Sequence, residues 1–259
     1  MVAPRDAAAG GGGEAEQELA RFAGARERTL AMAAGVSQER LDRAPGPAVS
    51  PAGPAGPAAA AAATSAVAAA AAAAATSAVG GRRWSPGEVL DHLLLAERFY
   101  RGEMERLIEL ARSGRPAELR RSFADLDISV AFIPRPLLPL LEPPLAVANL
   151  FLPAALRDLM TRHAWVPAQN PTVATPRRGR PGDELRADLA ASLAATRALF
   201  AANPGLDFSR MVHYHPLLGS NTVPRMLRFM TLHEQRHQDQ LAAALGGEPG
   251  RGGGGEEGG

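Results

Sequence analysis

Residues 224–241 read PRMLRFMTLHEQRHQDQL and have the pattern of one amphipathic helix. Its apolar face contains two histidines among apolar side chains, with successive members three or four residues apart: Met226, Met230, His233, His237 and Leu241. Side chains at positions i and i+4 of a helix are neighbours, so both imidazoles can reach one metal ion at about 2.0–2.1 Å. Because inward polar groups need partners, the pair indicates two ligands of a metal site.

A second inward histidine follows a strong helix start in WSPGEVLDHLLLAE, residues 84–97. Ser85 is placed as the N-cap, Pro86 as the first helical residue, and Glu88 closes a Ser-x-x-Glu capping box. This start puts His92 on the buried face, and we predict it as the third ligand. The alternative is that each inward histidine is a hydrogen-bonded core residue, which for the pair at 233 and 237 requires two separate partners.

These segments resemble the DinB-like (DinB/YfiT) superfamily, whose members are four-helix bundles with three histidines around a divalent metal. The resemblance is carried by residues 84–92, by 215–219 followed by 232–241, by 35–43 and by 182–185. It implies an all-α fold, a four-helix bundle of DinB/YfiT type. His92, His233 and His237 match the family's ligand positions.

The bundle domain is expected to span residues 14–246, between a disordered N-terminus at 1–13 and a disordered glycine-rich tail at 247–259. Helix one is predicted at 14–32 and helix three at 183–202. Helix three has inward residues Leu185, Leu189, Leu193, Thr196 and Phe200. A low-complexity Ala/Pro/Gly insert at 46–81 follows helix one. Such a long loop costs on the order of 2 kcal/mol in closure entropy, which a domain of this size tolerates.

A Pro-rich apolar insert at 116–165 lies between helices two and three. Its prolines and charges argue against a membrane span. We expect it to pack across the bundle with a short helix near 145–160, while His163 and Trp165 follow in a loop as packing or surface residues. The alternative is a lid or a homodimer contact that covers the metal pocket.

Three further polar residues lie near the predicted site. His213 and His215 either line the pocket mouth as proton shuttles or position the loop before the last helix. His233-Glu-Gln-Arg-His237 also satisfies the His-Glu-x-x-His pattern of zinc proteases, in which Glu234 is the general base. Those proteases take a further ligand downstream, whereas the glycine-rich residues after His237 contain no histidine. Helical geometry instead points Glu234 about 100° away from His233, toward a neighbouring helix or solvent.

Composition narrows the function classes. The net charge is only +1, with 28 basic and 27 acidic residues, and aromatic residues make up 5% of the chain. Both values argue against nucleic-acid binding. The absence of cysteine leaves His, Asp and Glu as the strong metal ligands. The N-terminal sequence has no apolar targeting segment, so a cytoplasmic location is the simplest expectation.

Three neutral histidines leave the charge of a divalent ion uncompensated and a coordination position open, which favours Lewis-acid catalysis. The resemblance implies a transferase that uses a low-molecular-weight thiol, or a related reaction, acting on a small-molecule substrate. Zinc or nickel is the expected metal, with iron and manganese as alternatives, and no catalytic residue is assigned. The competing hypotheses are a non-catalytic metal-binding helical bundle or interaction module, and a metalloprotease.

Overall fold

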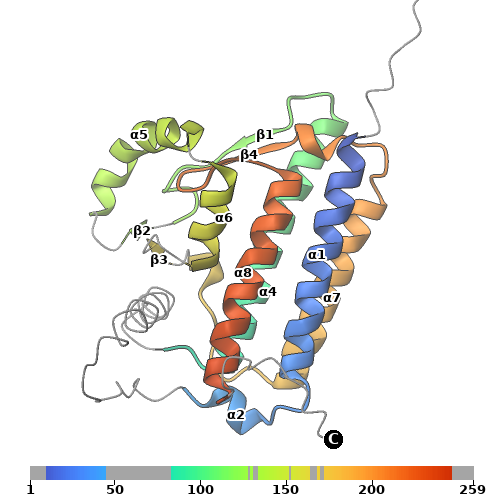
Figure 1. Ribbon diagram of the computed structural model, residues 1–259, viewed down its shortest axis with the longest axis vertical. Coiled ribbons are helices and arrows are strands. Elements are labelled where there is room, and N and C mark those ends of the chain that lie inside the picture. The colour runs from blue at the N-terminus through green and yellow to red at the C-terminus, as the bar shows by residue number, and fades with distance from the viewer. Residues whose placement is uncertain are drawn as a thin grey trace, which may run out of the picture.

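The computed structural model describes residues 10–44, 83–127, 129–130, 134–151, 153–163, 168–169 and 172–246. In this part of the chain, four long helices lie side by side (Figure 1): α1 (Gly10–Ala33), α4 (Pro86–Arg112), α7 (Gly182–Ala201) and α8 (Val223–Ala244). Helix α1 packs along α8 and α7, and α4 packs along α7 and α8. The expected helices are therefore present, although α1 begins at Gly10, inside the N-terminal segment 1–13 that was expected to be disordered. Of the other expected segments, residues 1–9, the insert at 46–81 and the tail at 247–259 lie outside the described residues.

Helix α4 begins where the sequence predicts. The Ser85 hydroxyl accepts from the Glu88 amide at 3.3 Å, and the Glu88 carboxylate accepts from the Ser85 amide at 2.9 Å. This capping box satisfies amides that have no partner within the helix. Helix α8 follows Thr222, whose side chain makes no capping hydrogen bond.

Short strands accompany the helices, so the expectation of an all-α fold was too simple and the protein is mostly helical. Strands β1 (Glu118–Arg120), β4 (Val212–His215) and β5 (Gly219–Thr222) form a sheet in the order β1-β4-β5. Strand β4 pairs parallel with β1 and antiparallel with β5. A two-stranded antiparallel sheet joins β2 (Ser129–Val130) to β3 (Ala168–Gln169). The β4–β5 hairpin leads directly into α8, and thereby sets where that helix starts.

The Pro-rich insert forms two helices where one was expected, α5 (Leu138–Phe151) and α6 (Ala154–His163). Helix α6 packs along α8, as the expectation of packing across the bundle requires. His163 ends α6 and does not lie in a loop, and Trp165 is outside the described residues. Among the described residues, none of the helices combines the length and apolarity that a membrane crossing needs.

Short helices complete the described elements: α2 (Gln38–Asp42) and the single 3-10 turns η1 (Arg135–Leu137), η2 (Thr172–Ala174) and η3 (Phe208–Arg210). Helix α2 and η2 both pack on α4. Turn η2 is important for the site, because it brings the segment before α7 against the first half of α4.

The bundle core has two apolar clusters with a polar layer between them. One cluster contains Phe22, Met104 and Met230, and the other contains Trp84 and Leu241. Between these clusters along the helices lie buried polar side chains: Arg26 on α1, Glu97 on α4, Ser192 on α7, and His233, Glu234 and His237 on α8. The predicted ligands therefore sit inside the bundle and not at its rim.

Candidate metal centre

Three histidines from two helices meet in the interior. His92 lies on α4, and His233 and His237 lie one turn apart on α8. One ring nitrogen of each lies within 4.8 Å of the others, and the Nε2 atoms of His92 and His233 are 3.2 Å apart. All three side chains are buried. The structure thus brings together the residues that the sequence singled out.

Two of the rings have their tautomer fixed by oxygen acceptors. His92 Nδ1 lies 2.7 Å from the Ala174 carbonyl oxygen, and His237 Nδ1 lies 2.8 Å from Gln240 Oε1. Because these oxygens only accept, each Nδ1 must carry the proton and each Nε2 keeps its lone pair. Histidines that bind metals are held in the same way by a second hydrogen bond.

The surroundings keep the rings neutral. Burial lowers the pKa of His92 to about 4, with the charge of Arg236 adding to the effect. Burial, together with the neighbouring histidines and Arg236, also holds the pKa values of His233 and His237 well below their usual range. Neutral imidazole is the form that coordinates a metal.

Aromatic rings cover the group on two sides. The Trp84 ring centroid lies 4.7 Å from that of His92, and 6.1 Å from that of His237 in a stacked arrangement. Phe229 stacks on His233 at 5.8 Å. These walls limit the access of water to the three nitrogens.

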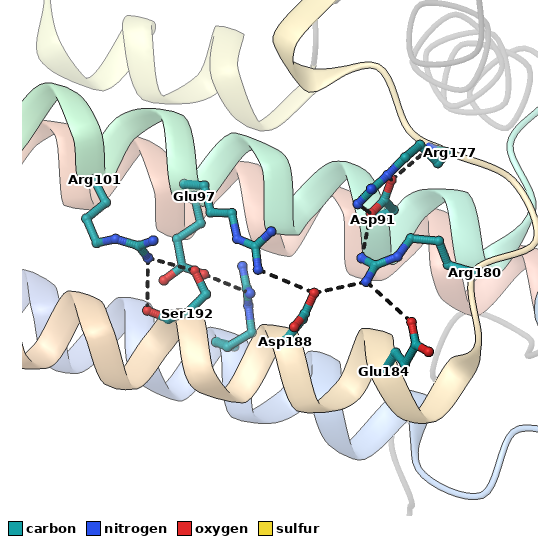
Figure 2. A network of polar contacts seen from close by, with 10 residues as sticks. Asp91, Glu97, Arg101, Arg177, Arg180, Glu184, Asp188 and Ser192 are labelled. Carbon is teal, nitrogen blue, oxygen red and sulfur yellow. Dashed lines mark hydrogen bonds and ion pairs between the residues drawn. The ribbon is translucent and has the colours of Figure 1, made fainter.

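Asp91, next to His92, ties the Ala174 segment to α4 (Figure 2). Its carboxylate accepts from the Arg177 amide at 2.7 Å and from Arg180 Nη1 at 2.9 Å. Burial alone raises the pKa of Asp91, but the hydrogen bonds from Arg177 and Arg180 outweigh it and lower the pKa. Sequence reasoning missed this contact, and the only signal for it was an acidic residue beside the predicted ligand.

Glu234 faces α1 and is turned away from the three histidines. Its carboxylate accepts two hydrogen bonds of 2.9 Å from Arg26, one from Nε and one from Nη2. Arg26 Nη1 also lies 2.9 Å from Glu97 Oε2, in an ion pair that is not aligned as a hydrogen bond. Of the two directions expected for the Glu234 side chain, toward a neighbouring helix or toward solvent, the structure shows the first, because it points to α1. A carboxylate held in this way is poorly placed to act as the general base of a protease.

Arg236 is a second neighbour that the sequence did not single out for function. Its Nη2 lies 3.2 Å from His237 Nε2 and its Nη1 lies 3.5 Å from the Thr161 carbonyl oxygen of α6. The Nε atom is enclosed and has no hydrogen-bond partner in the part of the chain that the structure describes. Burial lowers the pKa of Arg236 to about 10, with the charge of Arg162 adding to the effect. The residue is still a cation at neutral pH.

His213 and His215 lie on β4 and take no part in the three-histidine group. His213 Nε2 is 3.2 Å from Glu103 Oε2. His215 Nδ1 accepts from the backbone amides of Leu217 and Leu218 in the turn of the hairpin. His215 therefore organises the loop that leads to α8, which was one of the two expectations for it.

The donor set suits a divalent metal. Three neutral nitrogens without a thiolate are typical ligands of zinc, nickel, iron or copper. One contact competes with an ion, because the His237 Nε2 lone pair accepts from Arg236 in this structure. A bound ion requires that this guanidinium move aside.

Comparison with known proteins supplies the family. A family model described as the DinB superfamily matches residues 58–241, which include α4, α7, most of α8 and all three histidines. No curated protein and no solved structure matches the chain. The matched range covers well over half of the sequence, so the chain belongs to the DinB superfamily.

Proposed function

We propose that this protein is a metal-dependent enzyme that uses a low-molecular-weight thiol to act on a small-molecule substrate. The observation that supports the proposal is the convergence of three buried imidazole nitrogens within 4.8 Å of one another. His92, His233 and His237 are the proposed ligands, and zinc or nickel is the expected ion, with iron or manganese as alternatives. When bound, such an ion supplies Lewis-acid chemistry that favours the thiolate form of the thiol.

The chain's own residues prepare the site for that chemistry. The Ala174 carbonyl and the Gln240 amide oxygen hold two rings in the tautomer whose Nε2 lone pair can coordinate a metal. Trp84 and Phe229 shield the nitrogens, which strengthens electrostatic interactions with a bound anion. Three neutral ligands leave the positive charge of an ion uncompensated, so an anionic nucleophile is stabilised there.

Metal content and cobalt spectroscopy test the proposal together. We expect about one divalent ion per chain by elemental mass spectrometry, and a thiolate-to-cobalt absorption band when 2-mercaptoethanol is added to the cobalt-loaded protein. His237→Ala should lose the ion. His213→Asn is the matched control, because His213 is a buried histidine outside the group and its replacement should leave metal content unchanged.

A non-catalytic metal-binding bundle is the second candidate, favoured by the burial of all three rings. It predicts that the cobalt spectrum does not change when thiol is added, since a structural site has no open position. Full metal occupancy in His237→Ala would contradict both candidates.

A further inference from the structure

Arg236 has a cationic side chain without a carboxylate partner among the residues that the structure describes. Neighbouring arginines are paired: Arg26 with Glu97 and Glu234, Arg162 with Asp239, and Arg228 with Asp158. Within the described residues, Arg236 makes hydrogen bonds to the Thr161 carbonyl oxygen and His237 Nε2, and its enclosed Nε makes none.

This arrangement puts a cation, unpaired within the described residues, in contact with the three-histidine group. The guanidinium of Arg26 and the two carboxylates of Glu97 and Glu234 lie together on the α1 side of α8, where Glu234 points, and none of them pairs with Arg236. The imidazoles contribute no charge in their neutral form. A partly buried guanidinium that cannot be fully hydrated is costly unless an anion joins it.

Metal binding increases the need for an anion. The Arg236 Nη2–H group donates to the His237 lone pair that an ion would use. Once that lone pair is taken, the guanidinium loses an acceptor and faces a second positive charge. A carboxylate next to the ion can accept two hydrogen bonds from the planar guanidinium and balance both charges.

We propose that Arg236 is a specificity-determining residue that selects small thiols carrying a carboxylate. The proposal rests on the proposed function, because it identifies the class of thiol that the centre takes. The thiol sulfur is placed at the metal side, and the carboxylate is placed at Arg236, between α8 and the Thr161 end of α6.

Three probes separate the contributions of sulfur and carboxylate. Cobalt-loaded protein is titrated with 3-mercaptopropionate, with 2-mercaptoethanol and with acetate, and the cobalt spectrum gives each affinity. We expect 3-mercaptopropionate to bind at least about tenfold more tightly than 2-mercaptoethanol, as a charge-assisted bidentate pair allows. Arg236→Gln should reduce that ratio to about twofold or less. Arg228→Gln, which changes an arginine paired with Asp158, should leave the ratio unchanged.

The cobalt affinity of the variants is a second readout. It should change in a direction that the loss of a merely structural arginine would not produce. Removing a cation beside the ion should make Arg236→Gln bind cobalt as tightly as the unaltered protein or more tightly. Arg236→Lys keeps the charge without the planar fork and should retain part of the carboxylate preference, which covers the case in which the glutamine variant fails to fold.

The outcomes distinguish the two proposals. Equal affinity of the unaltered protein for the two thiols overturns the role of Arg236 and leaves the metal-dependent function standing. If a folded Arg236→Gln variant still prefers 3-mercaptopropionate over 2-mercaptoethanol to the same extent, the role of Arg236 is likewise overturned. Failure of the unaltered protein to load cobalt overturns the proposed function and this inference with it.

Discussion

His92 donates from Nδ1 to the Ala174 carbonyl oxygen across 2.7 Å, and this bond joins α4 to the segment before α7. The segment is held in place by the neighbouring residue on α4, because Asp91 accepts from the Arg177 amide and from Arg180. The orientation of His92 therefore depends on the contacts that Arg177 and Arg180, three and six residues after Ala174, make with Asp91 (Figure 2).

Replacing Asp91 with alanine should weaken metal binding without removing a ligand. Groups that orient metal ligands typically contribute about 10- to 100-fold in affinity, and we expect a loss of that size for Asp91→Ala. Isothermal titration of the metal-free protein with zinc measures it. Asp188→Asn is the control, since Asp188 pairs with Arg180 and Arg98 and does not touch Arg177. Equal zinc affinity of Asp91→Ala and the unaltered protein would show that Ala174 is positioned by other contacts.

The polar layer between the two apolar clusters should depend on Arg26. Arg26→Met leaves the buried carboxylates of Glu97 and Glu234 without their cation, and we expect a loss of about 3–5 kcal/mol in the free energy of unfolding. Urea denaturation measures the loss. Arg21→Met is the matched control on the same helix, because Arg21 is half exposed and pairs with Glu18 one turn away. A change of similar size in both variants would argue against the buried triad as the cause.

Local sequence signals predicted the elements that carry the site. The capping box fixed the start of α4, and the stripe from Met226 to Leu241 identified the buried face of α8. His92, His233 and His237 could be predicted for that reason, since helical periodicity places side chains on a face. The predicted inward face of α7 is also confirmed, because Leu185 and Leu189 are buried.

Contacts between distant parts of the chain could not be predicted in this way. The acceptor at Ala174 is a backbone carbonyl, which every residue has, so no side-chain pattern marks it. Arg26 lies within the predicted first helix, 14–32, but its partner Glu234 is 208 residues away. The parallel pairing of β1 with β4 is similarly non-local, and a three-residue strand has no periodicity to detect.

The cap of α4 supports the helix that carries His92. Ser85→Ala removes the acceptor of the Glu88 amide, and a lost N-cap of this kind costs about 1 kcal/mol in stability. Thermal unfolding measures the change. Ser37→Ala at the five-residue helix α2 should cost less, because its 3.4 Å capping contact lies in an exposed part of the structure. A larger loss at Ser37 than at Ser85 would contradict this ranking.

Glu103 should make the fold sensitive to acid. Burial alone raises the pKa of Glu103, but hydrogen bonds from His213 and Arg121 outweigh it and lower the pKa to about 2. A depressed folded-state pKa contributes stability that is fully present above the unfolded value of about 4.5 and is lost as the pH falls toward 2. Glu103→Gln should therefore lower stability at pH 7 and flatten its dependence on pH between about 4.5 and 2.

Urea midpoints measured from pH 7 down to pH 2 test this prediction for Glu103. Glu105→Gln provides the control on the same helix, because Glu105 is exposed and the ion pair that it makes with Arg101 is 3.6 Å long. Its midpoints should follow those of the unaltered protein. If the acid limb of Glu103→Gln also superimposes on that of the unaltered protein, the link between α4 and the hairpin strand β4 does not control acid unfolding.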